Sequence, residues 1–405
     1  MTLKRTGYAV LFIVLLLGIL PFLHKGTGGT SELPVYTIAA DRMLAGEEIY
    51  RLSDLKPFTY PPFFAVPFIP FPDLTIEPPR EAPPFVAWYL ITLLSVVIAV
   101  MLIRQHLPLD QLTFPNWLFY LVTLLIAGRY LGSVFGNQSH DLLVLLPIII
   151  AADQLIRGRQ KTAGLLLGLA AAFKATPLLF MVLLVAQKRW GALAAMLGTL
   201  CAVSLAPDLI FPRQDDQLWV MVWLNTFVLK LSSGGPADTG PWNAASILNQ
   251  SLAGTLHRIL DTEHVRWFIL AGQATVLALV GWCVLHPARD KVLLLAQFSA
   301  VLCGMVLLSP MSGKAHFCVL LLPVAVVSWD ALSSRRLLSF AGLAFAFSAG
   351  TLTSKDLIGR ELGDQVLAWG TATWISVVLL VCVVVICHST GNTAQADPNE
   401  PASNS

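Results

Sequence analysis

Repeated apolar runs set the main constraint on how this chain can fold. About ten such runs follow one another, each roughly 16 to 22 residues long, close to what an α-helix needs to cross a bilayer. Hydrophobic residues make up 56% of the chain and charged residues only 12%. These properties exclude an ordinary soluble domain and predict an all-α polytopic membrane protein. The predicted spans lie near residues 8–23, 84–103, 116–131, 140–156, 189–210, 266–285, 291–309, 315–332, 337–352 and 366–387.

One apolar segment, residues 163–187, does not fit a single crossing. It lies between two basic clusters, and basic loops tend to stay on the cytoplasmic side. Lys174 and Pro177 stand at its midpoint, where proline interrupts helical hydrogen bonding and an ammonium group needs a polar setting. We therefore predict two half-length helices, 163–173 and 177–187, that enter and return on the same side. With them, the prediction is about twelve membrane helices.

With that hairpin, the basic residues of the remaining loops all fall on one side, which is the cytoplasmic side by the positive-inside rule. Both chain termini are then expected to be cytoplasmic. Four unusual stretches fall on the opposite, outer side: residues 24–83, 135–141, 211–265 and 309–316. We expect the chemistry of the protein to be assembled from these four stretches.

Residues 1–388 are predicted to form one transmembrane domain, in which 24–83 and 211–265 are the two large outer loops. Residues 389–405 are polar, contain proline and serine and have no periodicity, which predicts a disordered cytoplasmic tail. The net charge is only +2, and the basic residues occur singly or in small groups between apolar runs. This pattern does not indicate a nucleic-acid surface. All six cysteines fall in or beside apolar runs, without metal-ligand spacing.

The first outer loop is expected to carry an amphipathic helix. Apolar residues recur at helical spacing between Val35 and Leu44, while charged residues between Glu32 and Glu47 occupy other faces. This pattern predicts a helix that lies on the membrane surface and ends at Gly46. Several prolines then follow, which forbid a regular helix until the chain returns to the bilayer.

A series of short motifs runs through the outer loops in a recognisable order. An acid precedes Val-Tyr and Ala-Ala pairs, then Leu-x-Gly-x-x-x-Tyr and Tyr-Pro-Pro-Phe; these residues are Glu32, Val35-Tyr36, Ala39-Ala40, Leu44 to Tyr50 and Tyr60 to Phe63. Further along come Gly136 to Ser139, Ala163-Gly164, Lys174 to Pro177, Lys188 to Trp190, Asn249 to Leu252, and Ser309 to Ser312 followed by His316. The series spans residues 31 to about 323 and resembles glycosyltransferase family 87, whose members have the multi-span GT-C fold.

The resemblance implies an inverting membrane enzyme that transfers a hexose, usually mannose, from a polyprenyl-phosphate carrier to an acceptor hydroxyl at the outer face. It also implies a carboxylate base at the position of Glu32, where the family usually has aspartate. A positioning change of about 1 Å can lower a rate by roughly two orders of magnitude. Asp41 therefore stays an alternative base.

The loop after Ser309 departs from the family pattern. The family commonly has an aromatic residue, an acid and two histidines there, and in this chain only His316 carries over. We expect His316 and the nearby Lys314 to meet the phosphate of the departing lipid, because fixed positive charge in a dry site stabilises it.

Further candidates for substrate binding come from the same motifs. Amide side chains at Asn137, Gln138, Asn249 and Gln250 are expected to bind sugar hydroxyls, although Asn137 and Asn249 also begin N-x-S sequons. Tyr36, Tyr60 and Trp242 are candidates for stacking on sugar or prenyl, although such rings more often anchor proteins at the membrane interface. Lys174 either faces the phosphate or is capped by carbonyls at the helix break.

The expected partners are a polyprenyl-phosphate sugar donor, a glycan or glycolipid acceptor and the lipid bilayer, and the expected location is the bacterial plasma (inner) membrane. We expect no cofactor and no metal ion, because side chains can neutralise one phosphate and no carboxylate cluster has hard-cation spacing. Two alternatives stay open. A broken helix with a midplane lysine also builds substrate sites in transporters and flippases, and a family relative that has lost catalysis would bind lipid only.

Overall fold

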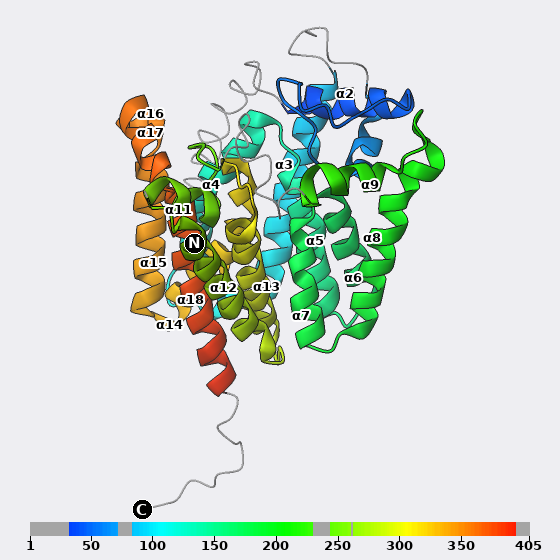
Figure 1. Ribbon diagram of the computed structural model, residues 1–405. Helices are drawn as coiled ribbons and strands as arrows, with labels where there is room; N and C mark the ends of the chain where they lie inside the picture. The colour runs from blue at the N-terminus through cyan, green and yellow to red at the C-terminus, as the bar shows by residue number, and fades with distance from the viewer. Residues whose placement is uncertain (1–31, 72–82, 230–243, 261, 394–405) are drawn as a thin grey trace, which may run out of the picture.

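The computed structural model describes residues 32–71, 83–229, 244–260 and 262–393, and every regular element within them is a helix (Figure 1). The elements in chain order are α2 (Leu33–Leu44), η1 (Pro62–Phe68), α3 (Pro83–His106), η2 (Leu109–Gln111), α4 (Asn116–Asn137), α5 (Asp141–Ile156), α6 (Gln160–Phe173), η3 (Thr176–Leu179), α7 (Phe180–Ala186), α8 (Trp190–Ile210), α9 (Trp219–Trp223), η4 (Leu224–Val228), α11 (Leu252–Ile259), α12 (Val265–Leu285), α13 (Lys291–Leu308), η6 (Lys314–Leu320), α14 (Leu321–Ser334), α15 (Leu337–Phe347), η7 (Ser348–Leu352), α16 (Lys355–Ile358), α17 (Arg360–Ala368) and α18 (Thr371–Thr393).

Long apolar helices make the chain an integral membrane protein. Within the described ranges, seven helices are long and apolar enough to span a bilayer: α3, α4, α8, α12, α13, η6 with α14, and α18. The predicted total of about twelve membrane helices is therefore not confirmed. The predicted span at 8–23 lies outside the described residues. α18 continues to Thr393, beyond residue 389 where the predicted tail begins.

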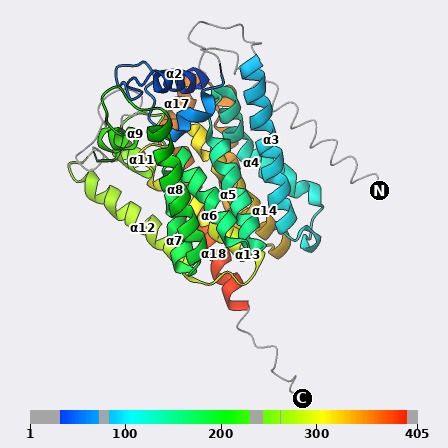
Figure 2. The same cartoon turned by 90° about the vertical axis from the view of Figure 1, so that its right-hand side faces the viewer.

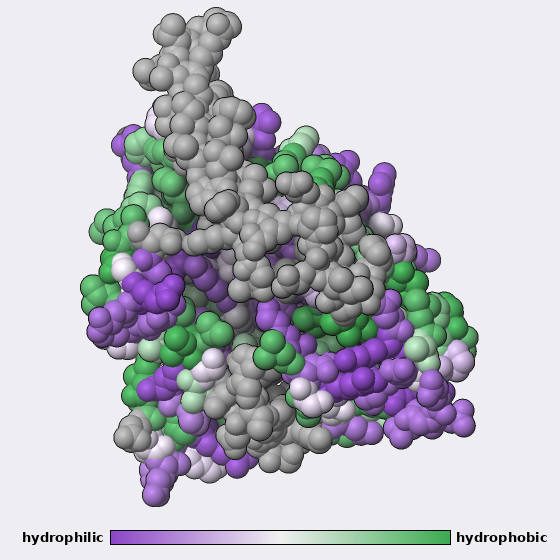
Figure 3. Space-filling view, turned by 90° about the horizontal axis from the view of Figure 1, so that it is seen from above, coloured by the Kyte–Doolittle hydropathy of each residue, from purple (hydrophilic) through white to green (hydrophobic). Residues whose placement is uncertain are grey.

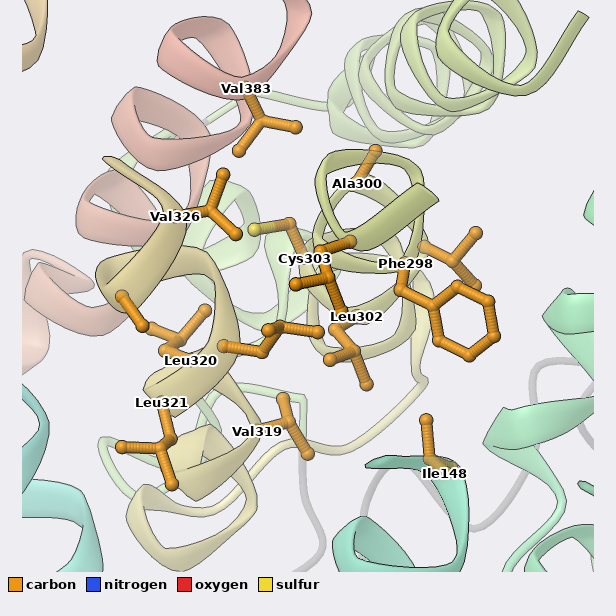
Figure 4. Packing of buried hydrophobic residues seen from close by; sticks show 14 of the residues in the cluster. Ile148, Phe298, Ala300, Leu302, Cys303, Val319, Leu320, Leu321, Val326 and Val383 are labelled. Carbon is orange, nitrogen blue, oxygen red and sulfur yellow. The ribbon is translucent and has the colours of Figure 1, made fainter. Parts of the chain in front are cut away.

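The long helices form an upright bundle, and α2 lies across one end of it, which we call the α2 end (Figures 1 and 2). α13 is the centre of the bundle, because every residue from Val292 to Leu307 is buried. Around it, Ile148 of α5, Val326 of α14 and Val383 of α18 belong to the same buried cluster as Phe298 and Leu302 of α13 (Figure 4). This buried apolar contact holds together elements that are far apart in the sequence.

The segment at 163–187 folds back on itself as predicted. α6 is followed by a break and then by η3 and α7, and α6 packs closely along α8. A Cβ added to Gly164 would lie 2.0 Å from the carbonyl oxygen of Ala192, and one added to Gly168 would lie 2.5 Å from that of Met196. Residue numbers therefore increase in the same direction along the two contacting helices, so α6 and α8 run parallel. The chain between them must return to the end at which α6 began. The glycine pair is thus a close helix contact.

The surface that covers α2 differs from the prediction. Its buried residues include Tyr36, Ala40 and Met43, which pack against η1 and the aromatic cluster around it, whereas Leu44 is 51% exposed. The expectation that this apolar face rests on the membrane surface was wrong, because the proline-rich segment folds beneath it. The helix does end before Gly46, which has a φ of +69°, a conformation that favours glycine.

The four stretches predicted to share one side do meet at the α2 end. In the view onto this end, hydrophilic and hydrophobic residues each form patches on the described surface (Figure 3). Backbone hydrogen bonds join the stretches in pairs: Glu32 N–H to Asn137 O at 2.8 Å, Gln214 N–H to Gly46 O at 3.0 Å and Gln250 N–H to Ser312 O at 2.8 Å.

Candidate functional site

The turn between α4 and α5 brings two titratable residues to the site. Gln138 ends α4 in the left-handed conformation, with a φ of +52°, and reverses the chain. His140 then precedes α5, and Asp141 is its first residue, where a carboxylate is favoured by the helix dipole. Asp141 is only 3% exposed, so its charge needs a partner inside the protein.

The break between α6 and η3 supplies that partner. Lys174 has extended backbone at the end of α6, and Pro177 prevents the α-helix from continuing through the residue before it. The ammonium Nζ of Lys174 donates to Oδ1 of Asp141 at 2.7 Å. The sequence left two roles open for Lys174, facing the phosphate or being capped by backbone carbonyls. In the structure its ammonium is held by the Asp141 carboxylate and not by carbonyls.

His316 approaches the same carboxylate from η6. Its Nδ1 accepts a hydrogen bond from the backbone N–H of Gly313 at 3.2 Å, so the neutral ring carries its proton on Nε2. That Nε2 lies 3.9 Å from Oδ1 of Asp141. Lys174 and His316, which are 142 positions apart in the chain, therefore meet at Asp141.

These three residues line a pocket that is polar on one side and apolar on the other. Its apolar wall comes mainly from α5, α13 and η6. The complete lining is Asp141, Val144, Lys174, Thr176, Met305, Val306, Ser309, Ser312, His316 and Val319.

Glu32 lies near this pocket, on the first outer loop. Its backbone N–H is bonded to Asn137 O, and its Oε1 lies 3.4 Å from Nζ of Lys56. Burial raises the pKa of Glu32 above its ordinary value, the charge of Lys56 opposes this rise, and the charge of Asp141 adds to it. The predicted base and His316 thus both interact with Asp141, which places them at the same end of the bundle.

Two predicted aromatic residues surround His140. The hydroxyl of Tyr36 lies 3.0 Å from Nδ1 of His140, and the Tyr60 ring centroid lies 4.4 Å from that of His140. Tyr36 is fully buried, and this burial raises its pKa well above the ordinary value. Their predicted contact with sugar or prenyl stays a prediction. Trp242 lies outside the described residues.

Asn249 and Gln250 hold the loop at 309–312 in place. Nδ2 of Asn249 donates to Pro310 O at 3.1 Å, and its Oδ1 accepts from the N–H of Ser312 at 3.2 Å. Nε2 of Gln250 donates to Leu367 O at 2.8 Å. Both residues are 0% exposed, so a sugar hydroxyl would have to displace these bonds. Their predicted role in sugar binding stays a prediction.

The remaining candidates lie at the α2 end but do not line the pocket. Asp41 is on α2, Lys314 begins η6, and Asn137 and Gln138 end α4. Within the described ranges, no group of three or more His, Cys, Asp and Glu side chains could hold a metal ion.

The sequence analysis missed Asp141, His140 and the two pocket serines. Asp141 was part of a stretch identified as unusual, yet it stands at the start of an apolar run, where an acid is also common as a helix-start residue. A signal was present in its setting: one acid at the start of a predicted span and one lysine in the middle of another need partners.

Comparison with known proteins bears directly on this site. The sequence profile of glycosyltransferase family 87 matches residues 58–310. A polyprenol-phosphate-mannose-dependent alpha-(1-2)-phosphatidylinositol mannoside mannosyltransferase from Mycolicibacterium smegmatis is 27% identical over 400 residues, covering 91% of this chain and 87% of the relative. The protein of the same description from Mycobacterium tuberculosis is 24% identical, covering 91% and 86%.

A second kind of relative is also similar. A polyprenol-phosphate-mannose-dependent alpha-(1-2)-phosphatidylinositol pentamannoside mannosyltransferase from Mycolicibacterium smegmatis is 27% identical, covering 83% of this chain and 79% of the relative. The family profile covers more than half of the chain, and these relatives extend the similarity over both the first outer loop and η6. The chain therefore belongs to glycosyltransferase family 87 and is a membrane glycosyltransferase.

Proposed function

We propose that this protein transfers a hexose, specifically mannose, from a polyprenyl-phosphate donor to a hydroxyl group of a glycolipid acceptor. The relatives are described as using polyprenol-phosphate-mannose and phosphatidylinositol mannosides. The observation that carries the proposal is the convergence of Lys174 and His316 on one pocket beside Glu32. The phosphate of such a donor needs hydrogen-bond donors and positive charge.

The proposed reaction is a direct displacement with inversion. The acceptor hydroxyl attacks C1 of the hexose on the face opposite the phosphate, and its proton passes to the carboxylate of Glu32. The new bond joins the acceptor oxygen to C1, while the bond between C1 and the phosphate oxygen breaks. Both electrons of that bond leave with polyprenyl phosphate, which gains one negative charge. Lys174 and His316 face this charge.

Glu32 is favoured as the base over Asp41. Its raised pKa moves the carboxylate toward neutral pH, where a general base works best. Asp41 stays the second candidate, because it is on the helix that Glu32 precedes. Tyr36, Tyr60, Asn137 and Gln138 lie close enough to the turn at 138–141 to contact the sugar or the acceptor, and Lys314 the phosphate at its outer edge.

The α2 end is proposed to face the outer side of a bacterial plasma (inner) membrane, with both chain termini cytoplasmic. Basic residues at 157–161 and at 188–189 lie at the opposite end of α6 and α8, where the positive-inside tendency places the cytoplasm. The proposed reaction uses no metal ion and no cofactor, because Lys174 and His316 supply the positive charge and the acidic hydrogen.

The proposal is tested by incubating purified protein with radiolabelled polyprenyl-phosphate-mannose and a phosphatidylinositol mannoside. We expect a mannosylated lipid and released polyprenyl phosphate in equal amounts. A transporter or a catalytically inactive relative would give neither product.

Replacing Glu32→Gln should lower kcat by about 10² to 10⁴, the usual contribution of a general base. Asp41→Asn is the matched control, since it removes a carboxylate from the same helix region, and should leave kcat within about twofold of wild type. The reverse outcome, with Asp41→Asn inactive and Glu32→Gln active, would move the role of base to Asp41.

A further inference from the structure

Asp141 is the least expected member of the pocket. A pocket that binds phosphate is normally lined by hydrogen-bond donors and cations. A carboxylate in such a pocket repels the phosphate anion. Yet Oδ1 of Asp141 accepts from the only lysine in the lining, and Asp141 is nearly fully buried. Asp141 therefore offsets the positive charge of Lys174 in this pocket.

The second oxygen of Asp141 does not accept the hydrogen bond from Lys174. Oδ2 is buried and has no hydrogen-bond partner among the described residues. His316 lies nearer to Oδ1, so it does not satisfy Oδ2 either. A buried polar atom without a partner in the protein is suited to binding a water, an ion or a ligand.

The position of Asp141 is fixed. It is the first residue of α5, and the turn before it is tied by a hydrogen bond from the backbone N–H of Ser139 to Val134 O at 3.1 Å. η6 packs against both α4 and α5 at this point. A bound phosphate therefore meets the carboxylate at a set distance and cannot displace it to the solvent.

The lipid donor and the lipid product of the proposed reaction differ in the charge of their phosphate group. The phosphate of the donor is a diester with one negative charge. The phosphate of the product is a monoester whose second ionisation has a pKa of about 6, so it carries close to two charges above neutral pH. A fixed carboxylate repels the second form more strongly.

We propose that Asp141 makes this pocket select by charge, favouring the singly charged phosphodiester of the lipid donor over the doubly charged phosphomonoester of the lipid product. The inference rests on the proposed function. Its consequence is that release of the leaving lipid is favoured once transfer has created the second charge, which limits inhibition by product.

The test measures binding without turnover, so that it does not depend on the acceptor. Two short-chain lipids are compared at pH 8: polyprenyl phosphate, which is a monoester, and its methyl ester, which is a diester without sugar. Binding to detergent-purified full-length protein is measured by titration calorimetry. Wild type should bind the methyl diester more tightly. Asp141→Asn should shift the ratio of the two affinities toward the monoester by about tenfold or more.

Asp153→Asn is the matched control, because Asp153 is an equally buried, ion-paired aspartate on the same helix but lies away from the pocket. It should leave the ratio of the two affinities unchanged. Asp141→Ser is a second variant for the case in which Asp141→Asn does not fold. It removes the same carboxylate and should shift the ratio of the two affinities in the same direction as Asp141→Asn.

The outcomes separate the two proposals. If wild type binds both lipids and neither variant changes their ratio, charge selection is overturned while the lipid-phosphate site stands. If Asp141→Asn weakens both lipids equally, Asp141 only positions Lys174, and charge selection is again overturned. If wild type binds neither lipid, the proposed function fails together with the inference.

Discussion

Helix α5 has a buried aspartate near each end, and the two residues have opposite surroundings. Asp141 and Asp153 are 3% and 4% exposed and lie twelve positions apart, about 18 Å along the helix axis. Both oxygens of Asp153 are satisfied, by His106 at 2.8 Å, by Arg157 at 2.8 and 2.9 Å and by Gln154 at 2.8 Å. Asp141 has one short contact, to Lys174, and one oxygen without a partner among the described residues.

The difference shows how a structural carboxylate can be told from a functional one in the same helix. Burial is equal, so burial does not distinguish them. What differs is whether the hydrogen-bonding capacity is filled and whether the group faces a pocket. Asp153 closes a network that joins α3 to α5, whereas Asp141 belongs to an incomplete one, which is typical of a binding site.

The largest effect that sharpens this comparison is expected from Lys174→Met. Loss of the cation should lower kcat by about 10² to 10³, the range for removing one preorganised donor. It should also destabilise the protein by about 3 to 5 kcal/mol, because Asp141 is left as an uncompensated buried charge. Turnover of labelled donor and thermal unfolding in detergent measure the two effects.

The double variant Lys174→Met with Asp141→Asn separates the effect on activity from the effect on stability. It should recover most of the lost stability, since no buried charge is left unpaired, but none of the lost activity. Recovery of activity in the double variant would show that Lys174 acts only as a partner of Asp141, and the two ends of α5 would then be alike in function.

An intermediate effect is expected from Asp153→Asn. It breaks the ion pair with Arg157 and weakens the bond to His106, so the protein should lose about 1 to 3 kcal/mol of stability. Activity per folded molecule should stay within about twofold of wild type. A large fall in activity at unchanged stability would contradict the division of the two aspartates into structural and functional.

The smallest effect is expected from Lys56→Met. The charge of Lys56 lowers the pKa of Glu32, so its removal should raise that pKa further. Because a base must be ionised to act, the acid limb of the profile of kcat/KM against pH should move to higher pH, by less than about one unit for this partly exposed pair.

Arg51→Met is the control for Lys56→Met. Arg51 forms an ion pair with Glu47 on the same loop at 2.6 Å, and both side chains are well exposed. Its replacement should leave the acid limb in place. An equal shift in both variants would indicate a general effect of loop charge and would argue against Glu32 as the titrating base.

Much of the fold could be predicted from sequence, because span length and charge asymmetry are local signals. The limits of α8, α12 and α13 and the start of α4 follow from apolar runs, and the return of the chain at Lys174 follows from a proline and two basic clusters. The meeting of four loops at one end followed from the same charge argument.

The parts that were missed depend on contacts across the chain. What covers the apolar face of α2 depends on η1 folding beneath it, and no periodicity within α2 carries that information. The role of Asp141 was missed because its partner, Lys174, is 33 positions away and becomes its neighbour only when the hairpin returns. The buried roles of Asn249 and Gln250 likewise depend on the loop at 309–312, about 60 residues further along.

The close contact of α6 with α8 fixes how deep the pocket lysine lies. Gly164 and Gly168 lock the two helices lengthwise, so the height of Lys174 is set by the number of residues that follow the second glycine. Inserting or deleting a single residue between 168 and 174 would shift the ammonium by about 1.5 Å and turn it by about 100° around the helix axis. Chain length in this half-helix is thus as much a determinant of the site as the lysine itself.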